Sequence, residues 1–172
     1  IRWVLLASQA IGKSKGYNLL MSEDVLAAID SIKKLGIKVR IQKKYCEIVG
    51  NGINGFKYKK NLTINSKNSG TLSRLILGLL IKSPKKIKII GDKSLSKRDF
   101  SRVTIPLGKF GVKFSYKIKN KLPLTIFGTQ SAEGIEYLEN KGSAQCKRSV
   151  MLAALNATAT SPIRPKKSIK HK

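Results

Sequence analysis

An internal repeat constrains the fold of this chain more than any other feature of its sequence. Residues 34–39 read K-L-G-I-K-V and residues 109–114 read K-F-G-V-K-F, so Gly111 stands 75 residues after Gly36. In each copy the glycine suits the end of a helix, and a short strand pattern follows it. Such a repeat indicates stacked supersecondary units, although its period is longer than that of common solenoids.

The segments around the repeat predict short helices that alternate with short strands. Apolar residues at helical spacing predict helices at 2–11, 22–35, 69–81, 101–110 and 143–157. Strand patterns are expected at 17–21, 37–41, 45–49, 86–90, 112–116, 122–127 and 135–138, with the second and third forming a hairpin. The prediction is an α/β (α+β) domain of repeated βαβαββ units over residues 1–160. Residues 161–172, rich in proline and lysine, are expected to fray.

The charge of the chain favours anionic partners. Lys and Arg number 35 against 9 Asp and Glu, which gives a formal net charge of +26. Nucleic acid is the first partner to consider. However, the lysines are spread through every segment, aromatic residues make up only 6%, and no helix-turn-helix, zinc-finger or RNP motif is present. A basic nucleic-acid-binding module therefore stays as an alternative, as does a domain that serves only as a partner surface.

Several other classes of protein are disfavoured by the same sequence. The longest strongly apolar run, residues 75–81, is too short to cross a bilayer, and no signal-peptide core precedes Arg2. Cys46 and Cys146 lack metal-ligand spacing, which predicts a reducing, cytoplasmic location. The single histidine, His171, lies in the basic tail, so no metal site and no cofactor is expected.

Two glycine-containing motifs are interpreted as chance matches. Residues 50–55 match G-x-G-x-x-G after a strand, but a dinucleotide site needs a helix next, and the residues that follow lack an amphipathic start. Residues 12–14 resemble the end of a P-loop, yet position 7 is alanine where the motif needs glycine. The first motif is predicted to be a loop between two units.

Polar residues at the start of the first helix of each unit indicate an anion site. Asn68, Ser69, Gly70 and Thr71 precede one such helix, Ser143, Ala144 and Gln145 open the next, and Arg2 begins the earliest. Helix N-termini attract anions, and glycine allows a ligand close to the backbone. Taken alone, the blocks at 68–71 and 143–145 could be ordinary helix N-caps, and Arg2 could be a surface residue. Stacked units would bring these helix starts together at one end of the domain.

The loop at residues 91–98 adds a further candidate. It follows a predicted strand and ends in Arg98, whose guanidinium could hold a carboxylate or phosphate through two hydrogen bonds. A solvated basic loop is the alternative. Together these blocks describe a concentrated anion site without an acid–base pair.

Taken in order, the blocks resemble those of the 5-enolpyruvylshikimate-3-phosphate synthase family. They are N-S-G-T-x-x-R at 68–74, G-D-x-S-L-x-x-R at 91–98 and S-A-Q-x-K at 143–147, with Arg2, L-L-A at 5–7 and S-E-D-V at 22–25. The resemblance implies a two-domain enolpyruvyl transferase fold, each domain made of three βαβαββ units. It also implies transfer of the enolpyruvyl group of phosphoenolpyruvate to the 5-hydroxyl of shikimate 3-phosphate, with release of phosphate, in the shikimate pathway to chorismate and aromatic amino acids.

The resemblance also implies roles for single residues. Arg2, Ser143, Ala144 and Gln145 are expected to bind shikimate 3-phosphate. The residues expected on the phosphoenolpyruvate side are Asn68, Gly70, Thr71, Arg98 and again Gln145. A side chain at Gly70 would crowd the inhibitor glyphosate in this family, so glycine there implies a sensitive site.

Departures from the family pattern predict an incomplete protein. The Lys-Ser pair that precedes Arg2 in the family lies outside the chain, as does the whole second domain with its catalytic residues. Residues 168–172 read S-I-K-H-K where the family has S-R-N-H-T-E. Arg148 stands at a position that a small residue usually occupies in the family. We expect a fragment that is inactive alone, from a monomeric parent enzyme. The related UDP-N-acetylglucosamine enolpyruvyl transferase is an alternative, against which the blocks at 91–98 and 143–145 argue.

Overall fold

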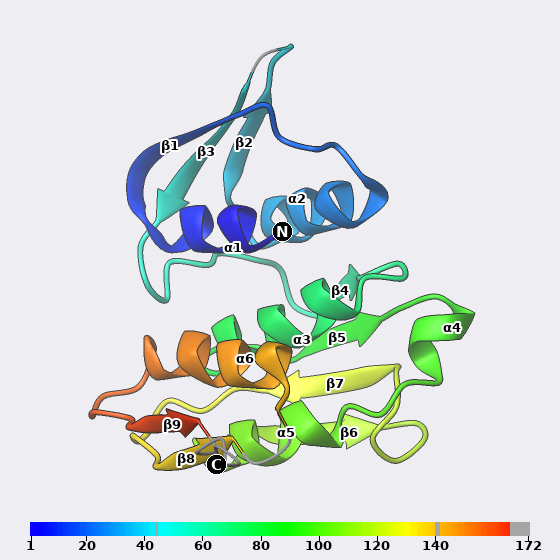
Figure 1. Cartoon of the computed structure of the whole chain (residues 1–172), viewed down its shortest axis with the longest axis vertical. Helices are drawn as coiled ribbons and strands as arrows, with labels where there is room; N and C mark the ends of the chain where they lie inside the picture. The colour runs from blue at the N-terminus through cyan, green and yellow to red at the C-terminus, as the bar shows by residue number, and fades with distance from the viewer. Residues whose placement is uncertain (44, 140–141, 166–172) are drawn as a thin grey trace, which may run out of the picture.

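The computed structural model describes residues 1–43, 45–139 and 142–165, which fold as stacked units (Figure 1). In the first unit β1, β3 and β2 form an antiparallel sheet in that order, beside two helices. Its elements are α1 (Arg2–Gln9), β1 (Ile11–Tyr17), α2 (Glu23–Lys34), β2 (Lys38–Ile41) and β3 (Tyr45–Asn51). The predicted hairpin is confirmed, with Lys38 opposite Val49 and Ile41 opposite Cys46.

The second unit has the complete βαβαββ order with one extra short helix. Its sheet runs β4-β5-β7-β6, in which β4 and β5 are parallel and the other neighbours are antiparallel. Its elements are β4 (Leu62–Asn65), α3 (Gly70–Leu79), β5 (Ile87–Ile90), α4 (Lys93–Ser96), α5 (Ser101–Gly108), β6 (Lys113–Tyr116) and β7 (Leu124–Phe127). The predicted fold class of repeated βαβαββ units is confirmed.

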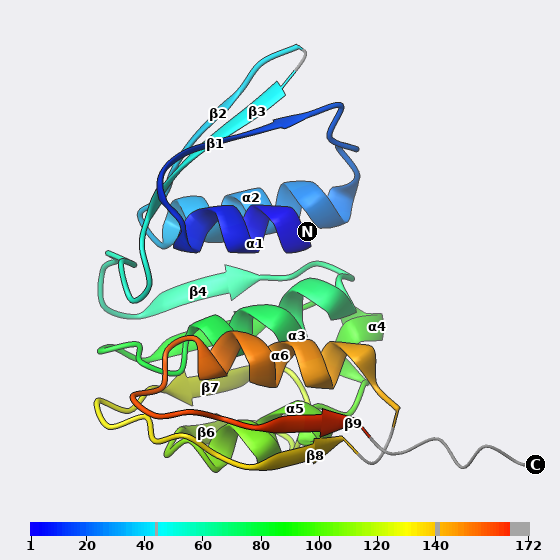
Figure 2. The ribbon, with the colours of Figure 1, turned by 60° about the vertical axis from the view of Figure 1, so that its left-hand side comes forward.

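A third unit starts in the same way. Strand β8 (Tyr137–Glu139) leads to helix α6 (Ala144–Ala154), and β9 (Ile163–Pro165) returns parallel to β8, as β5 returns to β4. Helices α1, α3 and α6 therefore hold the same place in their units. Both ribbon views show them starting at one side of the molecule (Figure 2). This arrangement confirms that the helix starts gather at one end.

The repeated glycines end equivalent helices. Gly36 follows α2 with a φ of +87°, and Gly111 follows α5 with a φ of +92°. These values lie in the left-handed region, which glycine enters without the steric cost that a Cβ brings. The repeat at 34–39 and 109–114 therefore marks two copies of one helix–turn–strand motif.

Helices α3 and α6 pack against each other at very close range. Gly78 of α3 makes this possible, because a Cβ on it would meet the backbone carbonyl of Ser149 on α6, whose carbon would be 3.0 Å away. Ser149 in turn donates a hydrogen bond of 2.7 Å from its Oγ to the Arg74 carbonyl oxygen. Eight of the ten residues of α3 are buried, so this helix pair forms the centre of the second and third units.

Several segments differ from the sequence-based prediction, among them α4, which lies in a stretch expected to be a loop. The strand expected at 17–21 is wrong: β1 covers Ile11–Tyr17 and pairs with β3 along its length. Its residues are mostly polar and exposed, so its strand character depends on the ladder with β3 rather than on an apolar pattern. Strand β4, which the prediction omitted, has only four residues.

The end of the chain departs from the prediction in a different way. Residues 163–165, expected to fray, pair with β8, and Ile163 packs against the core. Parallel pairing with a distant strand overrides the local composition there. Residues 166–172 lie outside the described residues.

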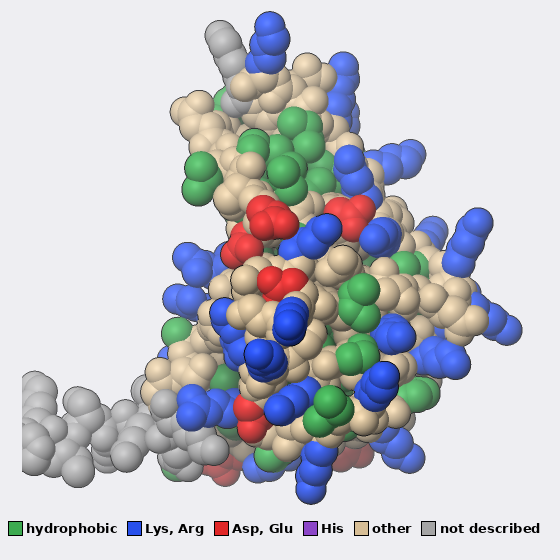
Figure 3. Space-filling model, turned by 90° about the vertical axis from the view of Figure 1, so that its right-hand side faces the viewer, with side chains coloured by type: hydrophobic (Ala, Val, Ile, Leu, Met, Phe, Trp, Pro, Cys, Tyr) green, Lys and Arg blue, Asp and Glu red, His purple; other side chains and the backbone are tan. Residues whose placement is uncertain are grey.

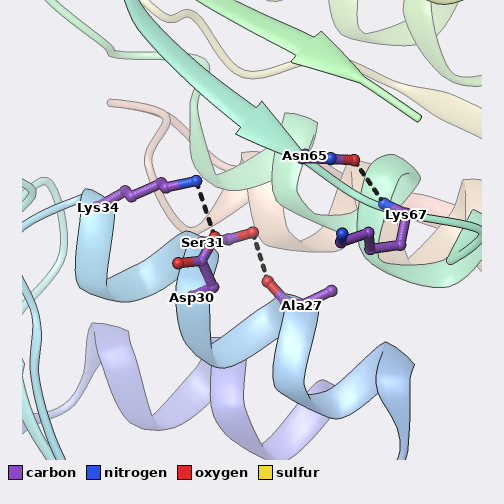
Figure 4. Close-up of polar contacts among 6 residues, drawn as sticks. All are labelled: Ala27, Asp30, Ser31, Lys34, Asn65 and Lys67. Atoms are coloured by element: carbon purple, nitrogen blue, oxygen red, sulfur yellow. Dashed lines mark hydrogen bonds and ion pairs between the residues drawn. The ribbon is translucent and has the colours of Figure 1, made fainter. Parts of the chain in front are cut away.

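Local hydrogen bonds stabilise α2 and the turn between β4 and α3 (Figure 4). On α2 the Ser31 Oγ donates to the Ala27 carbonyl at 2.7 Å, which satisfies this buried hydroxyl inside the helix. After β4 the Asn65 Oδ1 accepts from the Lys67 backbone N–H at 2.9 Å, and Lys67 has a φ of +52°. This turn leads through Asn68 and Ser69 into α3.

Candidate functional site

The start of α3 is held between two loops. Ser69 caps the helix, since its Oγ accepts from the Leu72 backbone N–H at 3.3 Å. The Asp92 N–H donates to the Lys67 carbonyl at 2.8 Å, which ties the loop before α3 to the loop after β5. The sequence blocks at 68–74 and 91–98 are thereby brought into contact.

Helix α4 carries Arg98 back toward the start of α3. The Asp92 Oδ1 accepts from the Leu95 N–H at 2.7 Å and caps this short helix. Arg98 Nη2 then donates to Asn68 Oδ1 at 3.4 Å. A Cβ built on Gly70 would lie 2.9 Å from Nη1 of Arg98 and 2.9 Å from Nη1 of Arg74. Two guanidinium groups therefore flank the bare backbone of Gly70.

Arg74 connects this loop to helix α6. Its Nη1 donates to Gln145 Oε1 at 2.8 Å, and Gln145 Nε2 donates to Thr71 Oγ1 at 3.0 Å. The Arg74 guanidinium also lies 5.3 Å from the centre of the Phe100 ring, a cation–π contact with a fully buried aromatic side chain. Gln145 thus joins the starts of α3 and α6 in a single hydrogen-bond network.

The electrostatics of the cluster favour a bound anion. Burial lowers the pKa of the Arg74 guanidinium from its usual value, and the nearby charges of Arg98 and Arg102 lower it further, while Cys146 and Asp99 act in the opposite direction. An arginine keeps its charge at neutral pH even so. An anion at the start of α3 would therefore relieve unfavourable energy, in addition to meeting free N–H groups and the helix dipole.

The chain is similar to a well-defined group of enzymes. A family model described as EPSP synthase (3-phosphoshikimate 1-carboxyvinyltransferase) matches residues 1–171. The chain belongs to the EPSP synthase family. The resemblance noted from its sequence blocks is thereby confirmed.

Relatives and solved structures agree with this family. The 3-phosphoshikimate 1-carboxyvinyltransferase of Streptococcus pyogenes serotype M2 is 37% identical over 163 residues, which is 94% of this chain and 38% of that protein. The Zymomonas mobilis enzyme of the same name is 38% identical over 156 residues, or 90% of this chain and 34% of the relative. The EPSP synthase structure from Acinetobacter baumannii superposes with a TM-score of 0.90 at 28% identity, covering 99% of this chain and 38% of that one. The chain thus spans a little over a third of the length of these relatives.

Within the EPSP synthase fold, the predicted site residues form one connected group and one dispersed group. Asn68, Gly70, Thr71, Arg98 and Gln145 are joined by the contacts described above. Ser143 caps α6, accepting from the Cys146 N–H at 3.3 Å, and Ala144 is the first residue of that helix. Arg2 begins α1 and lines a cavity between α1 and α6. All three lie at the starts of the gathered helices.

Sequence reasoning left out Arg74 as a site residue. It appeared only as the last residue of the block at 68–74, yet the structure makes it the link between Gly70, Gln145 and Phe100. Its spacing of four residues from Gly70, one helical turn, was an available signal, because such residues are neighbours on a helix surface.

The charged side chains on one face of the molecule are seen in Figure 3. This view faces the side on which α1, α3 and α6 begin, and Lys and Arg side chains are spread over the whole face, whereas the few Asp and Glu lie mostly near its middle. Across the described ranges, no three acidic, histidine or cysteine side chains gather into a possible metal site. None of the described helices has the length and apolar character to span a membrane.

Proposed function

We propose that this chain forms the substrate-binding part of a 3-phosphoshikimate 1-carboxyvinyltransferase. The enzyme would transfer the enolpyruvyl group of phosphoenolpyruvate to the 5-hydroxyl of shikimate 3-phosphate and release phosphate, a step toward chorismate and aromatic amino acids. The observation that carries the proposal is the pair of guanidinium groups, from Arg74 and Arg98, on either side of Gly70 at the start of α3. Family membership supports assigning this reaction to the anion site.

The two substrates would occupy neighbouring parts of the site. Phosphoenolpyruvate, with a phosphate and a carboxylate, suits Arg98 together with Asn68, Gly70 and Thr71, because guanidinium groups bind both anions well. Shikimate 3-phosphate would bind at the starts of α1 and α6, through Arg2, Ser143 and Ala144. Gln145 would touch both, since its amide already contacts Thr71 and Arg74 at the junction of the two helices.

This part of the site would bind and orient rather than carry out proton transfer. Addition and elimination of the enolpyruvyl group require protonation of its methylene carbon and deprotonation of a hydroxyl. The cluster consists of guanidinium, amide and hydroxyl groups, which are poor general bases at neutral pH. We therefore propose that the 172-residue chain alone binds its substrates weakly and does not turn them over. We also propose that the complete enzyme is a cytoplasmic monomer without a cofactor. Phosphate release by the purified chain would contradict the first of these statements.

Arg98→Ala is expected to weaken phosphoenolpyruvate binding by roughly tenfold or more, since a hydrogen bond to a charged group contributes about 1.5–3 kcal/mol. Titration calorimetry in the presence of shikimate 3-phosphate would measure the change. The matched control is Lys97→Ala, which removes an exposed positive charge from the next position. If both variants lost the same phosphoenolpyruvate affinity, the loss would come from the overall positive charge. That result would contradict the proposed role of Arg98.

Gly70→Ala is expected to leave the fold intact and to lower phosphoenolpyruvate affinity more than shikimate 3-phosphate affinity. The new methyl group would press on the ends of two arginine side chains, which can move, and alanine is a good helix former. The displaced guanidinium groups would no longer fit the anion. Thermal unfolding and titration of each substrate would test this, and an equal loss for both substrates would place Gly70 outside the phosphoenolpyruvate side.

A further inference from the structure

Acidic residues are absent from the sequence that forms the sheet of the second unit. Strands β4, β5, β6 and β7 all lie within residues 48–91 or 100–132, and none of the nine Asp and Glu of the chain falls in these two segments. Lysine is common throughout the chain, so the lack of carboxylates is what distinguishes this sheet. Its surface therefore has a positive charge that no acidic neighbour on the sheet offsets.

The face of this sheet that points away from the core presents two rows of side chains. Ile64, Ile89 and Ile126 are fully buried, so the residues next to them along each strand point outward. The strand register places four outward residues in one row across the sheet, namely Thr63, Lys88, Thr125 and Ser115. The same register, continued two residues further, gives a second row of Asn61, Lys86, Phe127 and Lys113. We call these two rows the outer face.

A hollow of about 400 Å³ lies on the outer face, and the two rows supply seven of its eight lining residues. An aromatic ring lines it, since Phe127 is 42% exposed. Lys86 and Lys88 are exposed beside it, and neither takes part in the ion pairs found among the described residues. The remaining residues of the rows add hydroxyl and amide groups. The hollow thus combines a stacking surface, two cations and several hydrogen-bonding groups.

Two loops continue the positive charge beyond one end of the outer face. The Tyr58 hydroxyl donates to the Lys85 carbonyl at 3.1 Å, and Lys85 Nζ donates to the Tyr58 carbonyl at 3.2 Å. These contacts hold the loop before β4 beside the loop before β5. Lys59 and Lys60 are exposed in the first loop, next to Tyr58 in sequence. Cations that extend past the hollow fit a chain of phosphates better than one small anion.

We propose that the outer face binds single-stranded nucleic acid. A base would stack on the Phe127 ring, because an exposed aromatic side chain can stack with any unpaired base. The phosphates on either side would contact Lys86 and Lys88, and the hydroxyl groups would bind the sugar or the edge of the base. A duplex fits less well, since its bases are already stacked on one another. This binding would be additional to the proposed enzymatic function and does not depend on it.

Fluorescence anisotropy of a labelled oligothymidylate of about 12 nucleotides would test the stacking role of Phe127. Saturable binding to the 172-residue chain is expected at low salt, and Phe127→Ala should weaken it at least about fivefold. The same substitution should leave binding of a duplex of equal length unchanged. Tyr17→Ala is the matched control, because it removes an exposed aromatic ring from β1 in the first sheet. It should leave the affinity for the oligonucleotide unchanged.

Salt dependence provides the second arm of this experiment. Lys86→Gln combined with Lys88→Gln should reduce the slope of log affinity against log salt by about 1.4, because each phosphate contact to a single strand contributes about 0.7. The matched control is Lys13→Gln combined with Lys15→Gln, which removes two exposed lysines at the same spacing from β1. Lys15 lies opposite Glu47 there, and this pair of substitutions should change the slope little.

Circular dichroism would verify that each variant is folded, and Phe127→Leu would replace Phe127→Ala if the latter is not. Absence of saturable binding would overturn the proposal. So would equal losses in the two lysine pairs, which would make the binding a response to net charge, or binding that Phe127→Ala leaves unchanged. Displacement of the oligonucleotide by phosphoenolpyruvate at constant ionic strength would place it at the start of α3, and would also overturn the proposal.

Discussion

Arg74→Ala should weaken binding of both substrates by tenfold or more and lower the free energy of unfolding by about 2 kcal/mol. The substitution removes the hydrogen bond to Gln145 Oε1 and the contact with the Phe100 ring. It leaves the partly buried amide oxygen of Gln145 without this donor, which costs about 1–3 kcal/mol. Because Gln145 joins the starts of α3 and α6, its loss of position should affect both halves of the site.

A conservative substitution separates charge from geometry at this position. Arg74→Lys keeps the positive charge but loses the planar guanidinium that reaches Gln145 and lies over Phe100. We expect Arg74→Lys to recover part of the stability and little of the substrate affinity. Chemical denaturation and calorimetry on the same samples would show this split, and full recovery of affinity by lysine would contradict a positioning role for Arg74.

Gly78→Ala should lower the free energy of unfolding by about 3 kcal/mol, near the upper end for overpacking of a core. The added methyl group would meet the Ser149 backbone carbonyl, which a helix cannot easily move aside, and Leu152 Cβ at 3.2 Å. Helices α3 and α6 would have to separate. For a chain of this size the unfolding temperature should fall by roughly 8 °C, as differential scanning fluorimetry would record.

Gly108→Ala is the matched control for this prediction. Gly108 ends α5, and a Cβ there would have no atom within 4 Å. Its replacement should be neutral or add up to about 1 kcal/mol, because alanine favours the helix. Substrate affinity should also fall in Gly78→Ala and not in Gly108→Ala, since the link from Arg74 to Gln145 crosses the α3–α6 contact. Equal stability of the two variants would contradict the close packing at Gly78.

Much of the architecture follows from local sequence signals. The repeated K-x-G motif located the ends of α2 and α5, where the glycines adopt a positive φ. The serine at position 69 predicted the start of α3, and the serine at 143 the start of α6. These signals depend on residues within one or two helical turns of each other, so they can be recognised without knowledge of the tertiary contacts. Strand β1 lacked such a signal, because its polar residues form a strand only by pairing with β3.

The sequence by itself determined the units, the helix starts and the residue types of an anion site. Only the tertiary structure decided how those residues connect. Arg74 and Gln145 lie 71 positions apart, and their contact exists because Gly78 lets α3 and α6 approach closely. The cavity between α1 and α6 likewise arises from elements more than 130 residues apart. Periodicity and capping are short-range properties of the chain, whereas these contacts depend on how whole units stack, which no local pattern specifies.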